Sequence, residues 1–426
     1  MLHYTTLPEL SVLAYLMSRI CCEDIKMRLY KNHKNPCFPS TMCRTTLCII
    51  LTAIMLSACQ DPYQNAHSGG PTAVETDDFQ AAIFYYDYTD VYLSSVRTAL
   101  IKELAALGIA YNEYDAEASQ ATQDTQIETA IRSHADVLVV NIVSSGSSGV
   151  ADNICLKAER AGIPVIFFNR SIEADGDEGV ILDYYNNVAF VGTDPAEAGH
   201  LQGQMIGDYV SRHFKEMDLN DNGEISYAMF KGEAKNAEAI YRTKYSVEDA
   251  NDILTSAGMP KLVYFNLKSV DAFQLDLTGK WSLTAAQDYM MADLSQYNRD
   301  NDNMIELVIC NNDNMAEGCV RALQTVGYNL PKEESTVIPV FGVDATAAAK
   351  KLIEDGAMTG TVVQDADGMA KAISQLVNNV YEKRELLDGM QDYAYDKEHD
   401  LKNKIYIPYH LYDPKQNPQN DGEESR

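Results

Sequence analysis

The sequence is poor in basic residues, and this scarcity argues against two classes of function. Its 426 residues include 34 Lys and Arg against 62 Asp and Glu, which gives a formal net charge of −28 at pH 7. Nucleic-acid binding proteins neutralise phosphates with clustered Lys and Arg, and peripheral proteins bind anionic membranes through basic patches. We therefore expect no nucleic-acid partner and no membrane attachment through a basic surface.

The motifs of several large enzyme classes are also missing. The sequence has no Gly-rich phosphate loop, no G-x-S-x-G nucleophile motif and no zinc-ligand spacing. Beyond residue 59 the cysteines are Cys155, Cys310 and Cys319, which are too scattered for a disulfide framework or a zinc site. We predict that the protein is not an enzyme.

Long hydrophobic runs are absent as well, and the longest apolar stretch is short. Residues 46–58 form an uncharged apolar run that suits a signal peptide better than a membrane span. It ends in Leu56-Ser57-Ala58-Cys59, which is typical of a bacterial lipoprotein cleavage site and predicts lipidation of Cys59. The alternative is a membrane anchor that is never cut.

This run sets the expected layout of the chain ends. We predict a leader and lipoprotein signal peptide over residues 1–58, in which residues 1–41 are an over-extended start, because Met42 stands where a signal peptide would begin. The polar residues 59–78 predict a flexible tether, and residues 416–426 a disordered tail.

From Phe79 onward, short apolar runs alternate with helical patterns. The expected strands are Ala81–Tyr86, Ile109–Tyr114, Val137–Val143, Pro164–Asn169, Ala189–Gly192, Ile225–Phe230, Leu262–Leu267, Leu307–Cys310, Pro339–Val343, Thr359–Val363 and Ile405–His410. The expected helices are Tyr92–Leu107, Thr122–His134, Gly149–Ala161, Asp194–Lys215, Ala237–Ala257, Ala285–Tyr297, Asn314–Val326, Ala345–Asp355 and Ala366–Lys383. This alternation predicts an α/β protein with doubly wound parallel sheets, and the number of strands predicts two such domains.

Polar side chains follow several of these strands. Examples are Asp90, Asn169, Asn312, Asp344 and Gln364. Because ligands of such sheets bind beyond the carboxyl ends of the strands, and amides and carboxylates suit neighbouring hydroxyls, these residues predict a site for a neutral polar ligand. The alternative for each Asp or Asn is a helix cap.

At this point the sequence resembles a known family. The segments that carry the resemblance are Ala82-Ile-Phe-Tyr-Tyr86, Tyr92-Leu-Ser-Ser-Val-Arg97, Pro164-Val-Ile-Phe-Phe-Asn169, Val191-Gly-Thr-Asp194, Lys231-Gly-Glu233, Ile309-Cys-Asn-Asn-Asp-Asn-Met315 and Ile338-Pro-Val-Phe-Gly-Val-Asp344. They look like the bacterial galactose/glucose-binding proteins, which are periplasmic binding proteins that serve sugar ABC transporters. The resemblance runs in order from about residue 80 to residue 412.

The resemblance implies a type I-like fold with a hinge of about three crossings near Thr193, Gln364 and Tyr406. One lobe would comprise residues 79–193 plus 365–406, and the other residues 194–364 plus 407–415. By the same resemblance, one hexose would bind between the lobes. The implied sugar-binding residues are Asp90, Tyr92, Asn169, Asn236, Glu238, Arg242, Trp281, Asn312, Asp344 and Gln364.

Some of these residues have other interpretations or depart from the family. Tyr92 and Trp281 could be core residues, and Arg242 could form a surface salt bridge with Glu238. The family commonly has His and Asp where this sequence has Asn236 and Glu238, and Asn where it has Gln364. Such changes at hydroxyl-binding positions can alter specificity, so galactose, glucose and another aldose remain open.

A calcium loop is also expected. Asp218, Asn220, Asn222, Gly223, Glu224 and Ser226 match the opening of an EF-hand loop, but its twelfth position is Met229. The resemblance supplies the missing carboxylate from Glu306 and so implies a structural Ca²⁺. The alternative is an empty hydrogen-bonded loop.

The function implied by the resemblance is extracytoplasmic binding of galactose or glucose and delivery to an ABC importer. The expected partners are the monosaccharide and the transporter permease, and the expected state is a monomer held to the cell membrane only by its lipid. The alternative is a receptor domain that senses another aldose, such as a pentose, for a chemoreceptor or sensor kinase without a transport role.

Overall fold

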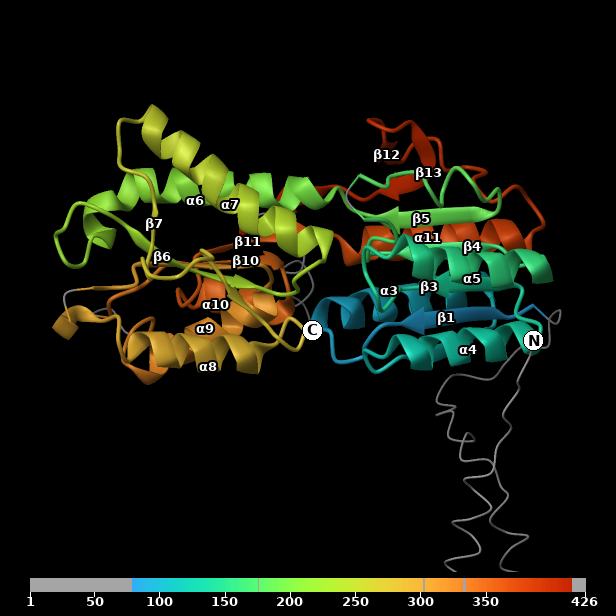
Figure 1. The fold of residues 1–426 in the computed structure, drawn as a ribbon, viewed down its shortest axis with the longest axis horizontal. Helices are drawn as coiled ribbons and strands as arrows, with labels where there is room; N and C mark the ends of the chain where they lie inside the picture. Colours follow the sequence, from blue (N-terminus) through green and yellow to red (C-terminus); the bar gives the residue numbers. More distant parts are fainter. Residues whose placement is uncertain (1–78, 175, 302, 332–334, 416–426) are drawn as a thin grey trace, which may run out of the picture. The chain divides into compact units, whose positions relative to one another are not determined.

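The computed structural model describes residues 79–415, with the exception of residues 175, 302 and 332–334. The predicted leader, Cys59, the tether and the C-terminal tail lie outside the described residues. Those described lie in one unit of the chain, residues 73–426. Two mostly parallel sheets with helices on both faces make up this unit, which confirms the predicted α/β class with two parallel-sheet domains (Figure 1).

The first sheet forms the centre of what we call the first lobe. Its order is β12-β13-β5-β4-β3-β1-β2. The strands are β1 (Ala81–Tyr85), β2 (Tyr111–Asp115), β3 (Val137–Val140), β4 (Val165–Phe168), β5 (Val188–Gly192), β12 (Ala394–Asp396) and β13 (Leu401–Tyr406), and the helices are α3 (Val91–Leu107), α4 (Gln120–Arg132), α5 (Ser148–Ala161) and α11 (Ala366–Tyr381). Helices α3 and α11 cover one face of the sheet, and α4 and α5 cover the other.

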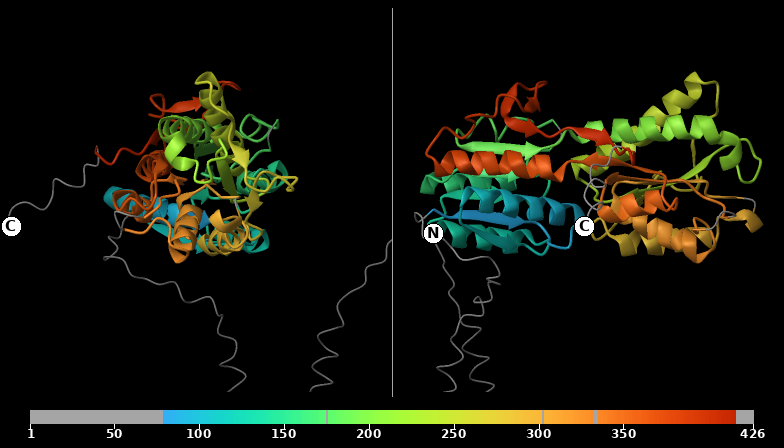
Figure 2. Two further views of the ribbon diagram at one scale, coloured as in Figure 1. Left: turned by 90° about the vertical axis from the view of Figure 1, so that its left-hand side faces the viewer. Right: turned by 180° about the vertical axis from the view of Figure 1, so that it is seen from behind.

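The second sheet forms the centre of the second lobe. Its order is β14-β11-β10-β9-β6-β7, with β8 paired to β6. The strands are β6 (Ser226–Lys231), β7 (Val263–Tyr264), β8 (Gln274–Leu275), β9 (Leu307–Cys310), β10 (Val340–Asp344), β11 (Gly360–Gln364) and β14 (Tyr409–Leu411), and the helices are α6 (Pro195–Met217), α7 (Ala237–Ser256), α8 (Leu283–Leu294), α9 (Asp313–Thr325), α10 (Ala347–Glu354) and a 3₁₀ turn at Arg299–Asn301. Helices α6 and α7 cover one face, and α8, α9 and α10 the other (Figure 2).

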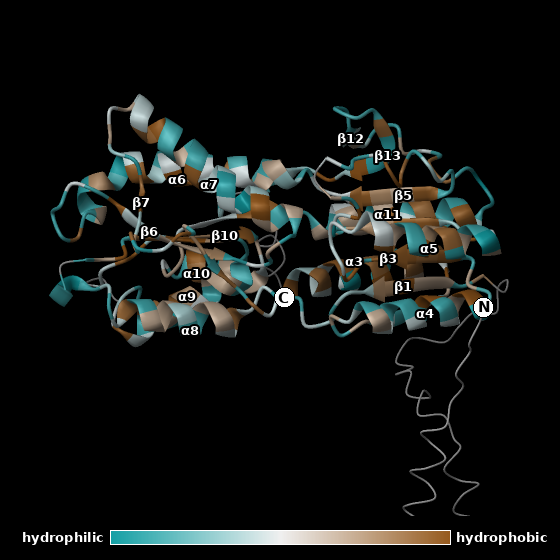
Figure 3. Ribbon diagram, in the orientation of Figure 1, coloured by the Kyte–Doolittle hydropathy of each residue, from teal (hydrophilic) through white to brown (hydrophobic). Residues whose placement is uncertain are grey.

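Burial explains the sequence pattern of the strands. The runs VLVV of β3 and VIFF of β4 are buried at every position, as expected for parallel strands that have helices on both faces. Hydropathy colouring shows brown, hydrophobic strands inside each lobe and teal residues on the outward sides of the helices (Figure 3). Among the described residues, no helix is both long enough and apolar enough to cross a membrane.

The chain passes between the two sheets three times. It crosses at Thr193 between β5 and α6, at Asp365 between β11 and α11, and at Ile407 and Pro408 between β13 and β14. The expectation of one strand over Ile405–His410 was wrong, because β13 pairs with β5 and β14 pairs with β11. Pro408 lacks a backbone N–H and cannot continue a ladder, which suits it to the connection.

Two further expectations about strands differ from the structure. The expected strand Leu262–Leu267 shortens to the two residues of β7, and the edge strands β8 and β12 were not predicted. These elements are short and half-exposed, so they lack the continuous apolar run that marks the central strands.

Candidate ligand-binding site

A narrow cavity lies where polar residues of the two lobes meet. Its volume, measured as the space open to the centres of water-sized molecules, is about 40 Å³. The first lobe contributes Tyr86, Asp90, Tyr92, Asn169 and Arg170, and the second Asn236, Glu238, Arg242, Trp281, Asn312, Asp344 and Gln364. The structure thus brings together all ten residues that the sequence proposed for sugar binding, and adds Tyr86 and Arg170.

Helix N-termini position three of these residues. Asp90 Oδ1 accepts from the backbone N–H of Leu93 at 2.9 Å, and its Oδ2 accepts from the hydroxyl of Tyr86 at 2.7 Å. Asn236 and Asn312 cap α7 and α9 in the same way. Helix capping and a position in the cavity are therefore compatible for these residues, because each side chain caps a helix with one atom and also lines the cavity.

A buried guanidinium brings a positive charge to the cavity from the second lobe. Arg242 is 3% exposed and donates to the backbone oxygen of Asn311 at 2.9 Å. Its Nη2 lies 2.9 Å from the carboxylate of Glu238, and its Nη1 lies 3.8 Å from that of Asp344. The salt bridge between Arg242 and Glu238, considered as an alternative role, is thus present, but it is buried at the cavity and does not lie on the surface.

Burial raises the pKa of two carboxyl groups that face the cavity. Desolvation raises the pKa of Asp344 well above its ordinary value, although Arg242 acts against it. Desolvation likewise raises the pKa of Asp90, although the backbone N–H of Leu93 and the Tyr86 hydroxyl lower it. Both groups would gain from hydroxyl donors that bind and stabilise their charged forms.

Two buried donors at the cavity are left without a protein acceptor. Within the part of the chain that the structure describes, Arg242 Nε and Gln364 Nε2 have no hydrogen-bond partner. A buried donor without an acceptor costs free energy, so such groups usually serve a bound molecule or water. Their presence at the cavity points to a ligand that carries oxygen acceptors.

Aromatic side chains from both lobes face the cavity. Tyr92 in α3 is 7% exposed, and its hydroxyl lies 3.7 Å from the sulfur of Met369. Trp281 is also 7% exposed and adopts a left-handed backbone conformation with φ of 55°. Both rings are buried, as the alternative of a core position predicted, and both also line the cavity.

Two neighbours fix the indole of Trp281. A Cβ atom placed on Gly232 would come within 2.2 Å of the ring, so only glycine allows this contact. The carboxylate of Asp276 accepts from the backbone N–H of Thr278 and of Ser282, both at 2.8 Å, and so braces the loop that carries Trp281. Gly232 belongs to the segment Lys231-Gly-Glu233, which contributes to the family resemblance. The sequence alone did not predict its packing against Trp281.

Ion pairs join the lobes beside the cavity. Arg170 donates to both carboxylate oxygens of Glu233, at 3.0 and 2.9 Å, and stacks its guanidinium over the ring of Tyr86. Lys280 lies 2.8 Å from the carboxylate of Asp87. Burial alone would raise the pKa of Asp87, but hydrogen bonds from Lys280 and Thr89 lower it overall. Arg170 directly follows the expected strand Pro164–Asn169, but its pairing with Glu233 in the other lobe could be found only from the fold.

The predicted calcium loop lies between α6 and β6, away from the cavity. Asp218 accepts from the backbone N–H of Asn222 at 3.0 Å and of Gly223 at 2.8 Å. Glu306 accepts from the backbone N–H of Leu219 at 2.7 Å and of Ser226 at 3.0 Å. The carboxylate expected from a distant strand is therefore beside the loop.

The oxygen ligands that this loop offers suit a hard cation. Burial raises the pKa of Glu306, and the nearby charge of Asp218 raises it further. A Ca²⁺ ion would relieve this repulsion, and each carboxylate oxygen keeps a lone pair beyond the backbone bond it accepts. Met229, at the twelfth position, is fully buried in the core and offers no such ligand.

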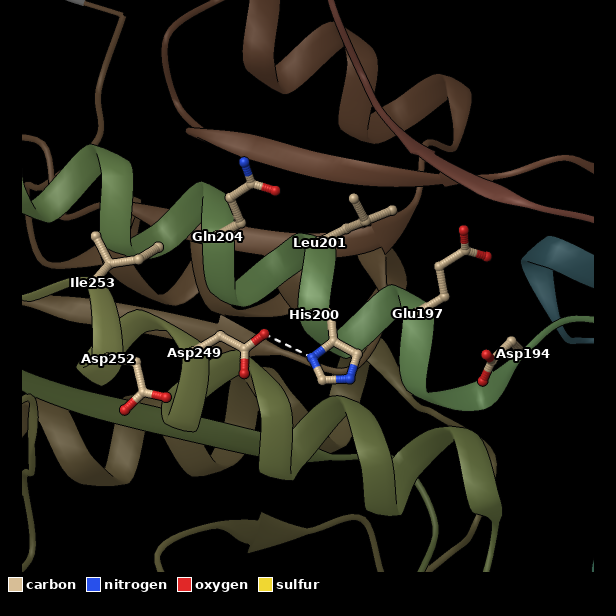
Figure 4. Close-up of a pocket in the computed structure, with 8 residues that line it drawn as sticks. All are labelled: Asp194, Glu197, His200, Leu201, Gln204, Asp249, Asp252 and Ile253. Carbon is tan, nitrogen blue, oxygen red and sulfur yellow. Dashed lines mark hydrogen bonds and ion pairs between the residues drawn. The ribbon is translucent and has the colours of Figure 1, made fainter. Parts of the chain in front are cut away.

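A wider hollow on α6 and α7 has a different character (Figure 4). It is lined by Asp194, Glu197, His200, Leu201, Gln204, Asp249, Asp252 and Ile253. Its main polar contact joins His200 Nδ1 and Asp249 at 2.6 Å, and both side chains are substantially exposed. We assign no site to this hollow. The described residues contain no group of three or more His, Cys, Asp and Glu side chains that could hold a metal ion, and the calcium loop differs in combining two carboxylates, Asp218 and Glu306, with amide and backbone oxygens.

Comparison with known proteins gives a consistent result. The family model of the periplasmic binding protein domain matches residues 81–385. The D-galactose/methyl-galactoside binding periplasmic protein MglB of Haemophilus influenzae is 31% identical over 344 residues, covering 80% of this chain and 91% of that protein. The D-xylose-binding periplasmic protein of Escherichia coli is 25% identical, covering 66% of this chain and 71% of that protein.

A solved structure supports the same fold. The ABC transporter solute binding protein of Bacillus halodurans with bound myo-inositol superposes with a TM-score of 0.58 at 23% identity, covering 81% of this chain and 97% of that one. At this identity the likeness concerns the fold alone.

Proposed function

The chain belongs to the periplasmic binding protein domain family, and on that premise we propose that it binds a hexose, galactose or glucose, outside the cytoplasm and delivers it to an ABC importer. The observation that carries the proposal is the cavity between the lobes, where two buried donors without acceptors lie beside carboxylates and aromatic rings. The galactose-binding relative at 31% identity supports the choice of sugar.

The chemistry of the cavity suits a pyranose. The ring faces of Tyr92 and Trp281 match the apolar C–H faces of a sugar, and they come from opposite lobes. Carboxylates and amides such as Asp90 and Asn312 offer paired acceptors and donors for neighbouring hydroxyls. Binding and orientation are the roles of these residues, and no step of catalysis is proposed.

Ligand binding would close the lobes about the three connections between them. Groups that bind one molecule from both sides favour the closed arrangement by the extra contacts that only it allows. The ion pairs Arg170–Glu233 and Lys280–Asp87 also join the lobes and would add to that preference. A permease would then distinguish loaded from empty protein by this closed face.

Three further parts of the proposal rest on separate features. The loop from Asp218 to Ser226 together with Glu306 would hold a structural Ca²⁺ through Asp218, Asn220, Asn222, the backbone oxygen of Glu224, and Glu306, with Ser226 beside it. Cys59 would carry the lipid that anchors the protein. A monomer would suffice, since both halves of the cavity come from one chain.

A pentose is the second candidate ligand. The xylose-binding relative at 25% identity supports it, and a sensing role with a chemoreceptor or sensor kinase would use the same site. Isothermal titration of the full chain with galactose, glucose, xylose and ribose separates the two. We expect a hexose to bind most tightly. Tighter binding of xylose or ribose would favour the pentose, and binding of none of the four would refute a sugar receptor.

A further inference from the structure

The cavity residue Asp344 stands at a tight connection with an unusual backbone. It is the last residue of β10, and Thr346, only two residues later, is the N-cap of α10. Asp344 has a φ of 117° and Ala345 a φ of 54°, and residues with a side chain rarely adopt either conformation. Such a backbone persists only where the surrounding structure holds it in place. We call residues 344–346 the strained turn.

The carboxylate of Asp344 keeps its hydrogen-bonding capacity for a ligand. It lines the cavity and lies 3.8 Å from Arg242 Nη1, which is too far for a hydrogen bond. Among the described residues, no protein donor forms a hydrogen bond with this carboxylate. The position of its oxygens therefore depends mainly on the backbone of the strained turn.

A buried carboxylate from a neighbouring element holds the strained turn. Asp313 is the first residue of α9 and is 1% exposed. Its Oδ2 accepts from the backbone N–H of Thr346 at 2.8 Å, and its Oδ1 accepts from the hydroxyl of Thr361 at 2.7 Å. The hydroxyl oxygen of Thr361 accepts in turn from the backbone N–H of Ala345 at 3.3 Å. Two consecutive N–H groups of the strained turn are thus bound, one by Asp313 directly and one through Thr361.

The packing around Asp313 is specific to this arrangement. A Cβ atom on Gly342 in β10 would collide with Asp313 Oδ1, so glycine at this position makes room for the carboxylate. The N-terminus of α9 is already capped by Asn312, whose side chain accepts from the backbone N–H of Met315 at 2.9 Å. The two oxygens of Asp313 therefore serve the neighbouring strands and the strained turn, and they are not needed to cap its own helix.

We infer that Asp313 is a positioning residue for sugar binding, which acts through the strained turn to place the carboxylate of Asp344 in the cavity. The inference rests on the proposed sugar-binding function and adds to it a residue that is not among those lining the cavity. Hydrogen bonds weaken steeply when their distance and angle are poor. If the strained turn relaxes to ordinary dihedral angles, Asp344 moves and loses its bonds to the sugar, while the contacts from other elements remain.

Titration calorimetry of the full chain with galactose and with glucose tests the inference. Asp313→Ala removes both acceptors, so we expect at least a tenfold loss of affinity. Asp313→Asn keeps an acceptor for Thr346 and a partner for Thr361, so we expect its affinity to stay within threefold of the wild type. Asp208→Ala is the control, since Asp208 is an exposed residue of α6.

The outcomes of this titration separate the inference from the function on which it rests. Unchanged affinity in Asp313→Ala, or an equal loss in Asp313→Asn and Asp313→Ala, would overturn the inference and leave the proposed function standing. If the wild type binds neither sugar, the proposed function itself is refuted.

Deoxy sugars distinguish positioning from general damage to the fold. The probes are the singly deoxygenated analogues of galactose and glucose, and Asp344→Asn gives the reference profile. An analogue that lacks the hydroxyl bound by Asp344 gains nothing from a correctly placed carboxylate. We therefore expect Asp313→Ala and Asp344→Asn to lose least affinity on the same analogue. An equal fold-loss of Asp313→Ala on every analogue would indicate general damage and overturn the inference.

Thr361→Val is a milder variant that carries the test if Asp313→Ala fails to fold. Valine keeps the shape of the side chain and removes the hydroxyl that joins Asp313 to Ala345. We expect at least a threefold loss of sugar affinity, with the same profile across the deoxy analogues. Thr325→Val is the matched control, since Thr325 is an exposed residue of α9. Equal affinity in Thr361→Val and the control would contradict the inference.

Discussion

Arg242 in α7 donates a hydrogen bond of 2.7 Å to the hydroxyl of Tyr409 in β14. The same guanidinium donates at 3.1 Å to Gln364, the last residue of β11, and Glu238 accepts from Thr193 just before α6. Thr193, Gln364 and Tyr409 each lie beside one of the three connections between the lobes. The Arg242–Glu238 pair therefore contacts both the cavity and every connection, and it can couple occupation of the cavity to the angle between the lobes.

Replacing Arg242 with Lys tests this coupling most severely. The variant keeps a positive charge but loses the planar guanidinium group, which donates hydrogen bonds to Asn311, Gln364 and Tyr409. It also leaves the carboxylate of Glu238 without its close partner. We expect the free energy of unfolding to fall by about 3–5 kcal/mol and sugar binding to be lost. Urea unfolding and calorimetry measure the two effects.

Tyr409→Phe is the milder companion variant. It removes one buried hydroxyl and keeps the ring, so we expect a loss of about 1–3 kcal/mol in stability and a measurably weaker sugar affinity. Tyr184→Phe, at an exposed position, provides the control. Unchanged stability and affinity in Tyr409→Phe would show that the hydroxyl contacts carry no coupling.

Gly232→Ala probes the packing of the indole. The added Cβ would collide with the Trp281 ring, so the ring must leave its position in the cavity. We expect sugar affinity to fall at least tenfold while the fold survives, because the loop that carries Trp281 is exposed at Leu277, Thr278 and Lys280 and can absorb a local shift. Gly149→Ala is the control, since a Cβ there meets nothing within 4 Å. Equal sugar affinity in the two variants would contradict the proposed role of this glycine.

Calcium should stabilise the folded protein. We expect a chelator to lower the melting temperature of the wild type, and Glu306→Gln to abolish the difference between calcium and chelator, because the loop would lose one of its two carboxylates. Asp221→Asn is the matched control, since Asp221 stands in the same loop but is exposed and outside the proposed ligand set. If the melting temperature of the wild type is the same with calcium and with chelator, the calcium proposal is refuted.

Stability should depend on pH through Asp313. Burial raises its pKa to about 7, although Thr361 and Thr346 donate hydrogen bonds that lower it. Below the ordinary aspartate pKa of about 4, both folded and unfolded chains hold the proton. Between about pH 4 and pH 7 only the folded chain holds it, so this contribution to stability falls as pH rises, by at most about 1.4 kcal/mol per pH unit.

Asp313→Asn isolates this contribution. An amide can accept from the Thr346 backbone and donate to the rotatable Thr361 hydroxyl, so the shape of the site is retained without a titrating group. Unfolding midpoints in urea from pH 4 to pH 8 should decline less steeply in this variant than in the exposed control Asp208→Asn. Parallel profiles for the two variants would contradict the assignment.

The sequence predicted the central strands and the cavity residues well for a physical reason. Buried parallel strands such as β3 and β4 are continuous apolar runs, and the residues just beyond strands are held near one edge by the sheet. The resemblance then supplied the residues on other elements, such as Trp281 and Arg242, whose spacing alone does not reveal a shared cavity.

Other features needed the three-dimensional structure. The division of one apolar segment between β13 and β14 depends on which sheet each half joins, and Pro408 alone does not specify it. The contact of Gly232 with Trp281 and the pairing of Arg170 with Glu233 join residues far apart in the chain. Such contacts depend on how distant segments pack together, and the hydrophobic periodicity of the sequence does not predict which distant residues will meet.

The most direct test uses the single tryptophan of the sequence. Since Trp281 lines the cavity, selective excitation of its indole reports on this site and on no other tryptophan. Titration of the full chain with galactose and with glucose should give a saturable change in emission with one site per chain, and calorimetry should return the same dissociation constant. Emission that stays constant while calorimetry detects sugar binding would place the sugar away from Trp281 and contradict the account.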